Sequence, residues 1–134
     1  MSSDNTILPE RNSLILTSPV SDFRIIYADP EPIYRFVFRV DIFNSSKLTV
    51  RLLARKWTMV SPDDNIFIIE AENVFNTSPI LSPRGVFSFG GMHDFPAPPK
   101  RLELRLAGID QLLTPFISAP CVFSKKQLTP VPAF

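Results

Sequence analysis

Apolar and polar side chains alternate with a period of two residues along several short stretches of the chain. The clearest stretch runs from Ile33 to Phe43. Successive side chains of a β-strand point to opposite faces, so this alternation predicts a strand with one buried face and one solvated face. The apolar series is Tyr34, Phe36, Phe38, Val40 and Ile42, and the polar series is Arg35, Arg39 and Asp41.

A second alternating stretch follows the turn Asn44–Lys47 and changes phase in its middle. Leu48, Val50 and Leu52 form one series, and the series that ends at Met59 starts from the adjacent Leu53. A β-bulge adds one residue to a strand and shifts the phase of its side chains in this way. We therefore expect a strand that is bulged or bent at Leu52–Leu53.

Further short strands are expected on both sides of these two. They are separated by Pro, Asn and Asp residues typical of turns, and residues 92–99, with three prolines, read as a loop. The segment from Ile66 to Glu72 is apolar on both faces in its first half. The other expected strands cover residues 13–17, 23–27, 86–89, 102–106, 112–117 and 121–123.

Eight or nine short strands without a helical period predict an all-β fold, an antiparallel β-sandwich. The composition agrees, since the 134 residues include 14 Pro, 12 Phe and only 4 Gly, and 45% are apolar. We expect a single sandwich domain over residues 13–126, with flexible tails at 1–12 and 127–134.

The residues argue against several kinds of chemistry. Cys121 is the only cysteine and His93 the only histidine, so an internal disulfide and the usual zinc ligand sets are excluded. No nucleophile-elbow motif accompanies His93, and we expect no catalytic residue, metal or cofactor. The chain begins without a signal-peptide pattern and has no apolar run long enough for membrane insertion, so we expect a cytoplasmic protein.

Charge is balanced over the whole chain, at +1, but it is distributed unevenly. Residues 33–60 carry six basic side chains and one acid, whereas residues 61–99 carry five acids and one arginine. Solvated strand faces account for such runs, and a basic stripe that meets an acidic partner or a phosphate is the alternative. The aromatic and basic residues show no paired RNA-binding motif, so nucleic-acid binding is not favoured.

Two segments resemble the ApaG domain family. Arg51-Leu-Leu-Ala-Arg-Lys-Trp57 is similar to the family's Q-L-L-S-R-H-W motif, which follows a strand and an Asn-centred turn. Ser78-Pro-Ile-Leu-Ser-Pro-Arg-Gly-Val-Phe-Ser-Phe-Gly-Gly91 is similar to the family's Q-P-x-L-x-P-G-x-x-F-x-Y-x-S-G segment. The resemblance covers roughly residues 22–124. It implies an immunoglobulin/fibronectin-III-like sandwich and a non-enzymatic module for protein–protein interaction.

The resemblance also implies a link to the bacterial phenotypes of cobalt resistance and magnesium efflux, under the alternative family name CorD. In one segment the chain departs from the family pattern. The family carries a glycine-rich run between the two motifs, a type of sequence that can cradle phosphate with backbone N–H groups. The matching stretch here, Glu70–Thr77, contains no glycine and has two glutamates.

The binding candidates are the basic and aromatic residues of the two family-like segments. We hypothesise that they belong to a surface for an unknown protein partner, with homodimerisation through edge strands as one form of it. The alternative is a small anion-binding protein that takes a phosphate or a nucleotide on a basic strand face. The same residues also have purely structural explanations, since the single tryptophan can pack in the core and the arginines can be solvated on a strand face. The candidates are Arg51, Arg55, Lys56, Trp57 and Arg84.

Overall fold

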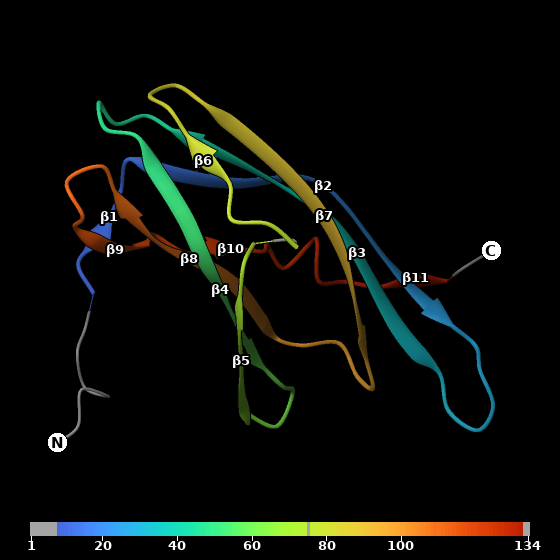
Figure 1. The fold of residues 1–134 in the computed structure, drawn as a ribbon. Helices are drawn as coiled ribbons and strands as arrows, with labels where there is room; N and C mark the ends of the chain where they lie inside the picture. The colour runs from blue at the N-terminus through green and yellow to red at the C-terminus, as the bar shows by residue number, and fades with distance from the viewer. Residues whose placement is uncertain (1–7, 75, 133–134) are drawn as a thin grey trace, which may run out of the picture.

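The protein is a two-layer β-sandwich in the computed structural model, which describes residues 8–74 and 76–132. Two sheets pack face to face, and the described residues form strands, turns and loops but no helix (Figure 1). The all-β sandwich expected from the alternating pattern is therefore confirmed. With no helix at all, these residues contain none long and apolar enough to cross a membrane.

The larger sheet is built around the long antiparallel pair β4 and β8. Its main path runs in the order β1-β9-β8-β4-β5, while β10 pairs with β8 and β6 pairs with β4 beside one end of β5. Its strands are β1 (Glu10–Arg11), β4 (Val50–Val60), β5 (Ile66–Glu72), β6 (Ile80–Leu81), β8 (Arg101–Asp110), β9 (Pro115–Ser118) and β10 (Cys121–Val122).

The smaller sheet runs in the order β11-β2-β3-β7. Its strands are β2 (Leu14–Ile26), β3 (Ile33–Asn44), β7 (Val86–Phe95) and β11 (Val131–Pro132). β3 pairs antiparallel with both long neighbours, and its apolar series points into the sandwich as the sequence predicts. The outward arginines of β3 are held by neighbouring carboxylates, since Arg35 pairs with Asp94 and Arg39 with Asp41.

Aromatic side chains fill the space between the sheets. Phe36 is fully buried and meets Phe23 and Phe123 edge to face, with ring centroids 5.4 and 5.2 Å apart. Trp57 lies 5.0 Å from Phe38, also edge to face. Such contacts are favoured geometries for buried rings, and among the described residues they involve Phe23, Phe36, Phe38, Phe89, Phe95 and Phe123.

The expected bulge lies at Leu53. The register of β4 on β8 shifts between Leu52, opposite Gly108, and Ala54, opposite Ala107. Leu53 is therefore an extra residue, and the strand changes face across it. Arg51 points to solvent, whereas Arg55 lies on the same side as the buried Trp57.

Several strand boundaries differ from those predicted. β7 continues to Phe95, so His93 lies in a strand and not in a loop. β2 is one long strand whose register is interrupted between Thr17 and Val20, where two separate strands were expected. Proline and polar residues in these stretches suggested chain breaks, but pairing with the long strand β3 carries both strands through them.

Described residues near both ends of the chain pair with the sandwich, within the segments 1–12 and 127–134 that were expected as flexible tails. β1 pairs parallel with β9, and β11 pairs parallel with β2. Arg11 reaches the buried Asp110, and Leu128 is buried in the core. Residues 1–7 and 133–134 of those segments lie outside the described residues.

Candidate functional site

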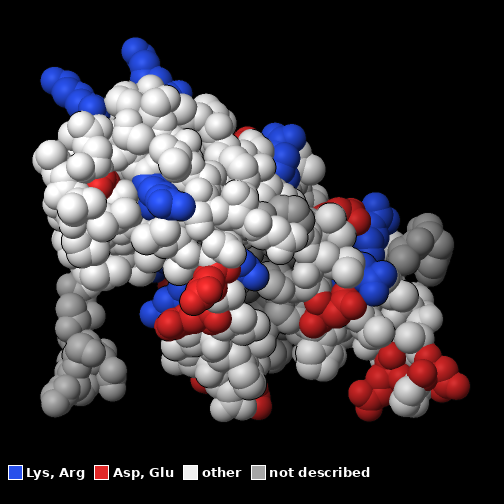
Figure 2. All heavy atoms as spheres, viewed as in Figure 1, with Lys and Arg blue, Asp and Glu red and all other residues white. Residues whose placement is uncertain are grey.

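β5 is an edge strand whose apolar side chains are exposed on both faces. Ile66, Phe67, Ile68 and Ile69 are 65%, 49%, 54% and 58% exposed. Contiguous exposed apolar surface of this kind is uncommon on soluble domains and marks interaction sites. Figure 2 shows the β4–β5 hairpin as a lobe with largely uncharged surface and acidic atoms near its tip. We call Ile66–Glu72 with its unpaired side the β5 edge.

The two faces of β5 are exposed for different reasons. Ile66 and Ile68 stand opposite Val60 and Thr58 and share the outer face of the sheet with them. Phe67 and Ile69 stand opposite Met59 and Trp57 and point to the inner side. Both remain about half exposed, so the opposite sheet does not cover them, and Figure 1 shows the hairpin standing apart from the ends of β3 and β7.

The main chain of β5 offers hydrogen-bonding groups at its free side. Ser61 N donates to Asn65 O at one end of the β4–β5 ladder, and Asn73 N donates to Leu53 O at the other. Bonded and non-bonded pairs alternate in an antiparallel ladder. The odd-numbered residues of β5 therefore bond to β4, and the N–H and C=O groups of Ile66, Ile68 and Glu70 face outward.

Arg55 organises the connection that follows β5. Its Nη1 donates to the backbone oxygens of Glu72 and Asn73, at 3.1 and 2.8 Å. The guanidinium therefore binds main-chain carbonyls at the end of β5. The connection then buries Val74 in the core.

The Asn73–Thr77 connection replaces the glycine-rich run of the family pattern. Asn73 and Asn76 have φ of 65° and 55°, the left-handed region in which asparagine is tolerated better than most residues. The amides of Asn73 and Val74 donate to Leu53 O and Thr77 O. Asparagines thus supply the turn geometry, and two amides that a phosphate cradle would need are used within the protein.

His93 lies on β7 and is close enough to Arg55 to feel its charge. Its ring stacks on Phe38 at 5.4 Å and meets Trp57 edge to face at 4.5 Å. The buried Nε2 has no hydrogen-bond partner within the described residues. Burial lowers the pKa of His93 and the charge of Arg55 lowers it further, although Asp94 acts in the opposite direction. His93 is therefore mainly a neutral packing residue near neutral pH.

The five residues singled out from the sequence do not converge. Arg51 is exposed on the outer face, Lys56 stands opposite Glu70, and Trp57 is 5% exposed in the core. Arg84 is exposed in the turn before β7, with φ of 68° and its amide donating to Asn44 O. Only Arg55 and Trp57 share the inner side, and both are occupied by internal contacts.

The described residues assemble no site for metal binding or for thiol chemistry. Within residues 8–74 and 76–132, no three His, Cys, Asp or Glu side chains group in a way that would hold a metal ion. Burial raises the pKa of the free Cys121 to about 11, so its thiol is protonated at neutral pH. A protonated, buried thiol is a poor nucleophile.

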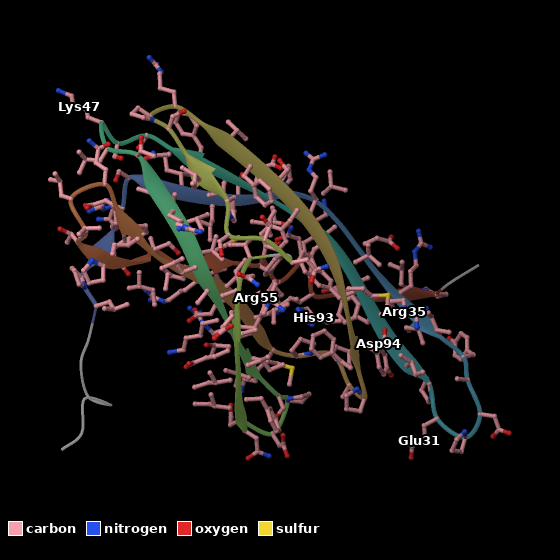
Figure 3. All side chains as sticks on the ribbon, in the orientation of Figure 1. Glu31, Arg35, Lys47, Arg55, His93 and Asp94 are labelled. Atoms are coloured by element: carbon pink, nitrogen blue, oxygen red, sulfur yellow. The ribbon has the colours of Figure 1, made fainter. Side chains whose placement is uncertain are left out.

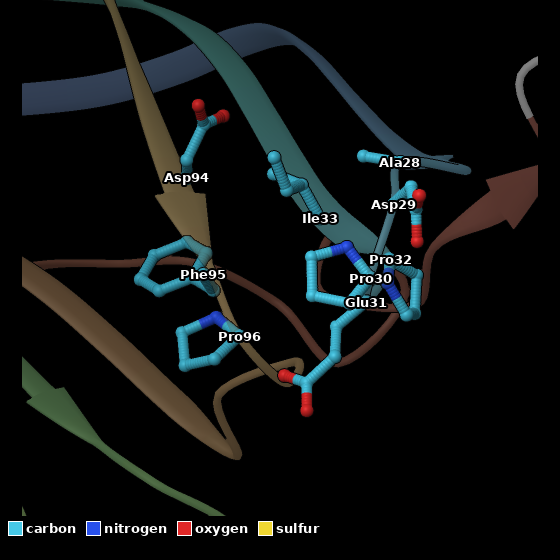
Figure 4. A pocket seen from close by; sticks show the side chains of 9 residues that line it. All are labelled: Ala28, Asp29, Pro30, Glu31, Pro32, Ile33, Asp94, Phe95 and Pro96. Atoms are coloured by element: carbon cyan, nitrogen blue, oxygen red, sulfur yellow. The ribbon is translucent and has the colours of Figure 1, made fainter.

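A shallow hollow of about 410 Å³ lies between the β2–β3 connection and the end of β7. Its wall is formed by Phe95 and three prolines, and carboxylates stand at its rim (Figure 4). Asp94 at this rim is bound by Arg35, as Figure 3 shows for the two labelled side chains. The lining residues are Ala28, Asp29, Pro30, Glu31, Pro32, Ile33, Asp94, Phe95 and Pro96.

The apolar run at the start of β5 is visible in the sequence, although none of its residues was among the five binding candidates. A strand that is apolar on both faces is typical of a fully buried position, yet β5 lies at an edge. The electrostatic effect of Arg55 on His93 had no such signal. It depends on the bulge, which turns Arg55 inward, and on the continuation of β7 beyond Gly91.

The comparisons with known proteins agree on one family. The model of the ApaG domain matches residues 27–103. Among curated proteins, Protein ApaG of Deinococcus radiodurans is 31% identical over 51% of this chain and 53% of its own length. Protein ApaG of Caulobacter vibrioides is 27% identical over 72% of this chain and 69% of its own length. The matched region is thus about half of the first relative.

Two solved structures share the fold. A structural-genomics target solved by X-ray crystallography superposes with a TM-score of 0.72 at 12% identity, covering 84% of this chain and 87% of its own. A Bordetella pertussis protein assigned as ApaA gives 0.65 at 18% identity, covering 87% and 94%. These likenesses confirm the expected fibronectin-III-like sandwich. Because the family model matches more than half of the residues, this chain belongs to the ApaG domain family.

Proposed function

We propose that this ApaG-domain protein is a non-enzymatic module for protein–protein interaction, and that the β5 edge is its binding surface. The observation that carries the proposal is the exposure of four consecutive apolar residues on a strand with a free side. An edge strand offers main-chain hydrogen bonds and side-chain contacts to an incoming segment. As part of the same proposal we place the protein in the cytoplasm, where the free, buried Cys121 needs no oxidising environment.

The anion-binding alternative has less geometric support. The bulge at Leu53 sends Arg51 and Arg55 to opposite faces, and Arg55 is engaged with carbonyl oxygens. A phosphate site requires several donors aimed at one point. Figure 3 shows Lys47 at one end of the molecule and Arg55 near its middle, so these two basic residues do not meet.

Site-specific photo-crosslinking in an extract of the source cells tests the proposed function. A photoreactive amino acid replaces Ile68 in one variant and Val37, exposed on the outer face of the other sheet, in a second. We expect a specific protein adduct from the Ile68 variant and a weaker one, or none, from the Val37 variant. The proposed function fails if neither variant yields a specific adduct.

A further inference from the structure

Charges around the β5 edge indicate what kind of segment it accepts. Asp63 and Asp64 precede the strand, and Glu70 and Glu72 lie at its other end. Lys100 binds Asp64, and Lys56 stands opposite Glu70, so both cations approach from the β4 side. Within the part of the chain that the structure describes, Glu70 and Glu72 form no ion pair, although both are exposed.

A second copy of this chain fits the β5 edge poorly. Two identical strands related by a two-fold axis pair antiparallel. If the axis passes through Ile68, Glu72 of one copy stands opposite Asp64 of the other. If it passes through Phe67, Glu70 takes that place. Like charges directly opposite each other destabilise a strand pair, so self-pairing is disfavoured.

We propose that the β5 edge binds an extended segment of another protein that is apolar in its middle and carries Lys or Arg at its ends, and that this segment adds to the sheet as a further strand. The inference rests on the proposed function and names the chemistry of its partner. The outward N–H and C=O groups of Ile66, Ile68 and Glu70 provide the ladder. Alternate apolar side chains of the partner lie beside Ile66 and Ile68 or beside Phe67 and Ile69, and its terminal cations meet the acidic residues.

The test uses the full chain and two synthetic peptides, Lys-Arg-Val-Thr-Val-Ile-Val-Arg-Lys and the same peptide with Glu at its four basic positions. Binding is followed by fluorescence anisotropy, and the site is located by hydrogen–deuterium exchange. We expect the basic peptide to bind at least about tenfold more tightly than the acidic one at low salt. Its binding should slow exchange of the amides of Ile66, Ile68 and Glu70, whereas the amides already bonded to β4 should change less.

A proline at position 68 provides a specific block. The amide of Ile68 faces away from β4, so Ile68→Pro removes a donor at the free side without breaking a bond of the β4–β5 ladder. We expect Ile68→Pro to weaken binding of the basic peptide by about tenfold or more. The matched variant Ile68→Thr keeps the amide and should retain most of the binding. The double variant Glu70→Lys with Glu72→Lys should reverse the preference between the two peptides.

Three results would overturn the inference. One is that Ile68→Pro keeps its fold and binds the basic peptide as tightly as the unchanged chain does, or that the peptide slows amide exchange elsewhere in the chain and not at β5. Another is equal affinity for the two peptides. The third is a dimer in sedimentation without peptide, with slowed exchange at Ile66, Ile68 and Glu70, since a second copy would then occupy the edge. A specific protein adduct from the Ile68 variant, together with equal affinity for the two peptides, would leave the proposed function standing while this inference fails.

Discussion

Arg11 and Asp110 lie 99 residues apart in the chain, and Nη2 of the arginine is 2.6 Å from Oδ2 of the aspartate. The Asp110 side chain is only 2% exposed, and the Arg11 guanidinium also lies 4.6 Å above the ring of Phe116. Asp110 further accepts hydrogen bonds from the amides of Leu112 and Thr114. One ion pair thus ties the first described strand to the turn between β8 and β9.

Replacing Arg11 should expose a pH-dependent loss of stability. The hydrogen bond from Arg11 and the two amides hold the pKa of Asp110 below its usual range. A depressed carboxyl pKa stabilises the fold above about pH 4, and this contribution is lost as the pH falls through the folded-state pKa. We expect Arg11→Met to lower the free energy of unfolding at pH 7, with a difference that shrinks below about pH 4.

Urea denaturation at several pH values measures this effect. The matched control is Arg101→Met, which removes the pair of the exposed Arg101 with Glu103 and should change stability by no more than about 0.5 kcal/mol. An equal loss in both variants, or a loss from Arg11→Met that does not depend on pH, would contradict the role given to Asp110.

His93 should make the fold less stable in mild acid. The unfolded chain takes up a proton near pH 6.5, whereas the folded pKa of His93 is lowered by burial and by Arg55. Between these two pKa values the unfolded state binds more protons, so stability decreases as the pH falls below about 6.5 and levels off under the folded pKa. We expect His93→Phe to remove this slope, as measured by urea denaturation between pH 7.5 and 5. A slope that persists in the variant would exclude His93 as its source, since the chain has no other histidine.

Arg55 should contribute to stability more than Arg51, although both belong to the same family-like motif. Arg55→Met removes the bonds to the carbonyls of Glu72 and Asn73 and should cost about 2 kcal/mol. Arg51→Met changes an exposed side chain and should cost no more than about 0.5 kcal/mol. The same Arg55 variant should raise the pKa of His93 in an NMR titration. Equal losses and an unchanged His93 pKa would show that the contact does not persist in solution.

Gly108 should tolerate no side chain. A Cβ at this position would lie 2.3 Å from the backbone oxygen of Arg51, beside the bulge. We expect Gly108→Ala to lower the free energy of unfolding by about 1–3 kcal/mol because the backbone must move. At Gly90 the nearest atom to an added Cβ is 3.3 Å away, so Gly90→Ala should cost less. Thermal unfolding of the two variants compares them, and an equal or larger loss at Gly90 would contradict the packing argument.

The strands and their inner faces could be predicted where burial is one-sided. The alternation from Tyr34 to Ile42 identified the inner face of β3, and the change of phase at Leu52–Leu53 located the bulge. These signals are local, because they depend only on which side chains a single strand must bury. The resemblance to the ApaG family rested on residues 51–57 and 78–91 and is confirmed.

The other features depend on residues far apart in sequence. Gly108 lies beyond the strand expected at residues 102–106, yet it belongs to β8, where it stands opposite Leu52 at the bulge of β4. The prolines after Gly91 are typical of a loop, so the sequence pattern did not predict that β7 continues to Phe95. No local pattern near Arg11 predicts its ion pair with Asp110. The bulge expected at Leu52–Leu53 separates Arg51 from Arg55, so these two arginines face opposite sides of β4.

The bulge at Leu53 reverses which alternate side chains of β4 face the core. Up to this residue the odd-numbered side chains meet water, and after it they meet the core. If Leu53 were paired as an ordinary strand residue, without a bulge, Lys56 and Thr58 would point into the sandwich and the only tryptophan out of it. The bulge, and not the side chain at position 53, therefore decides which residues in the second half of β4 reach the core.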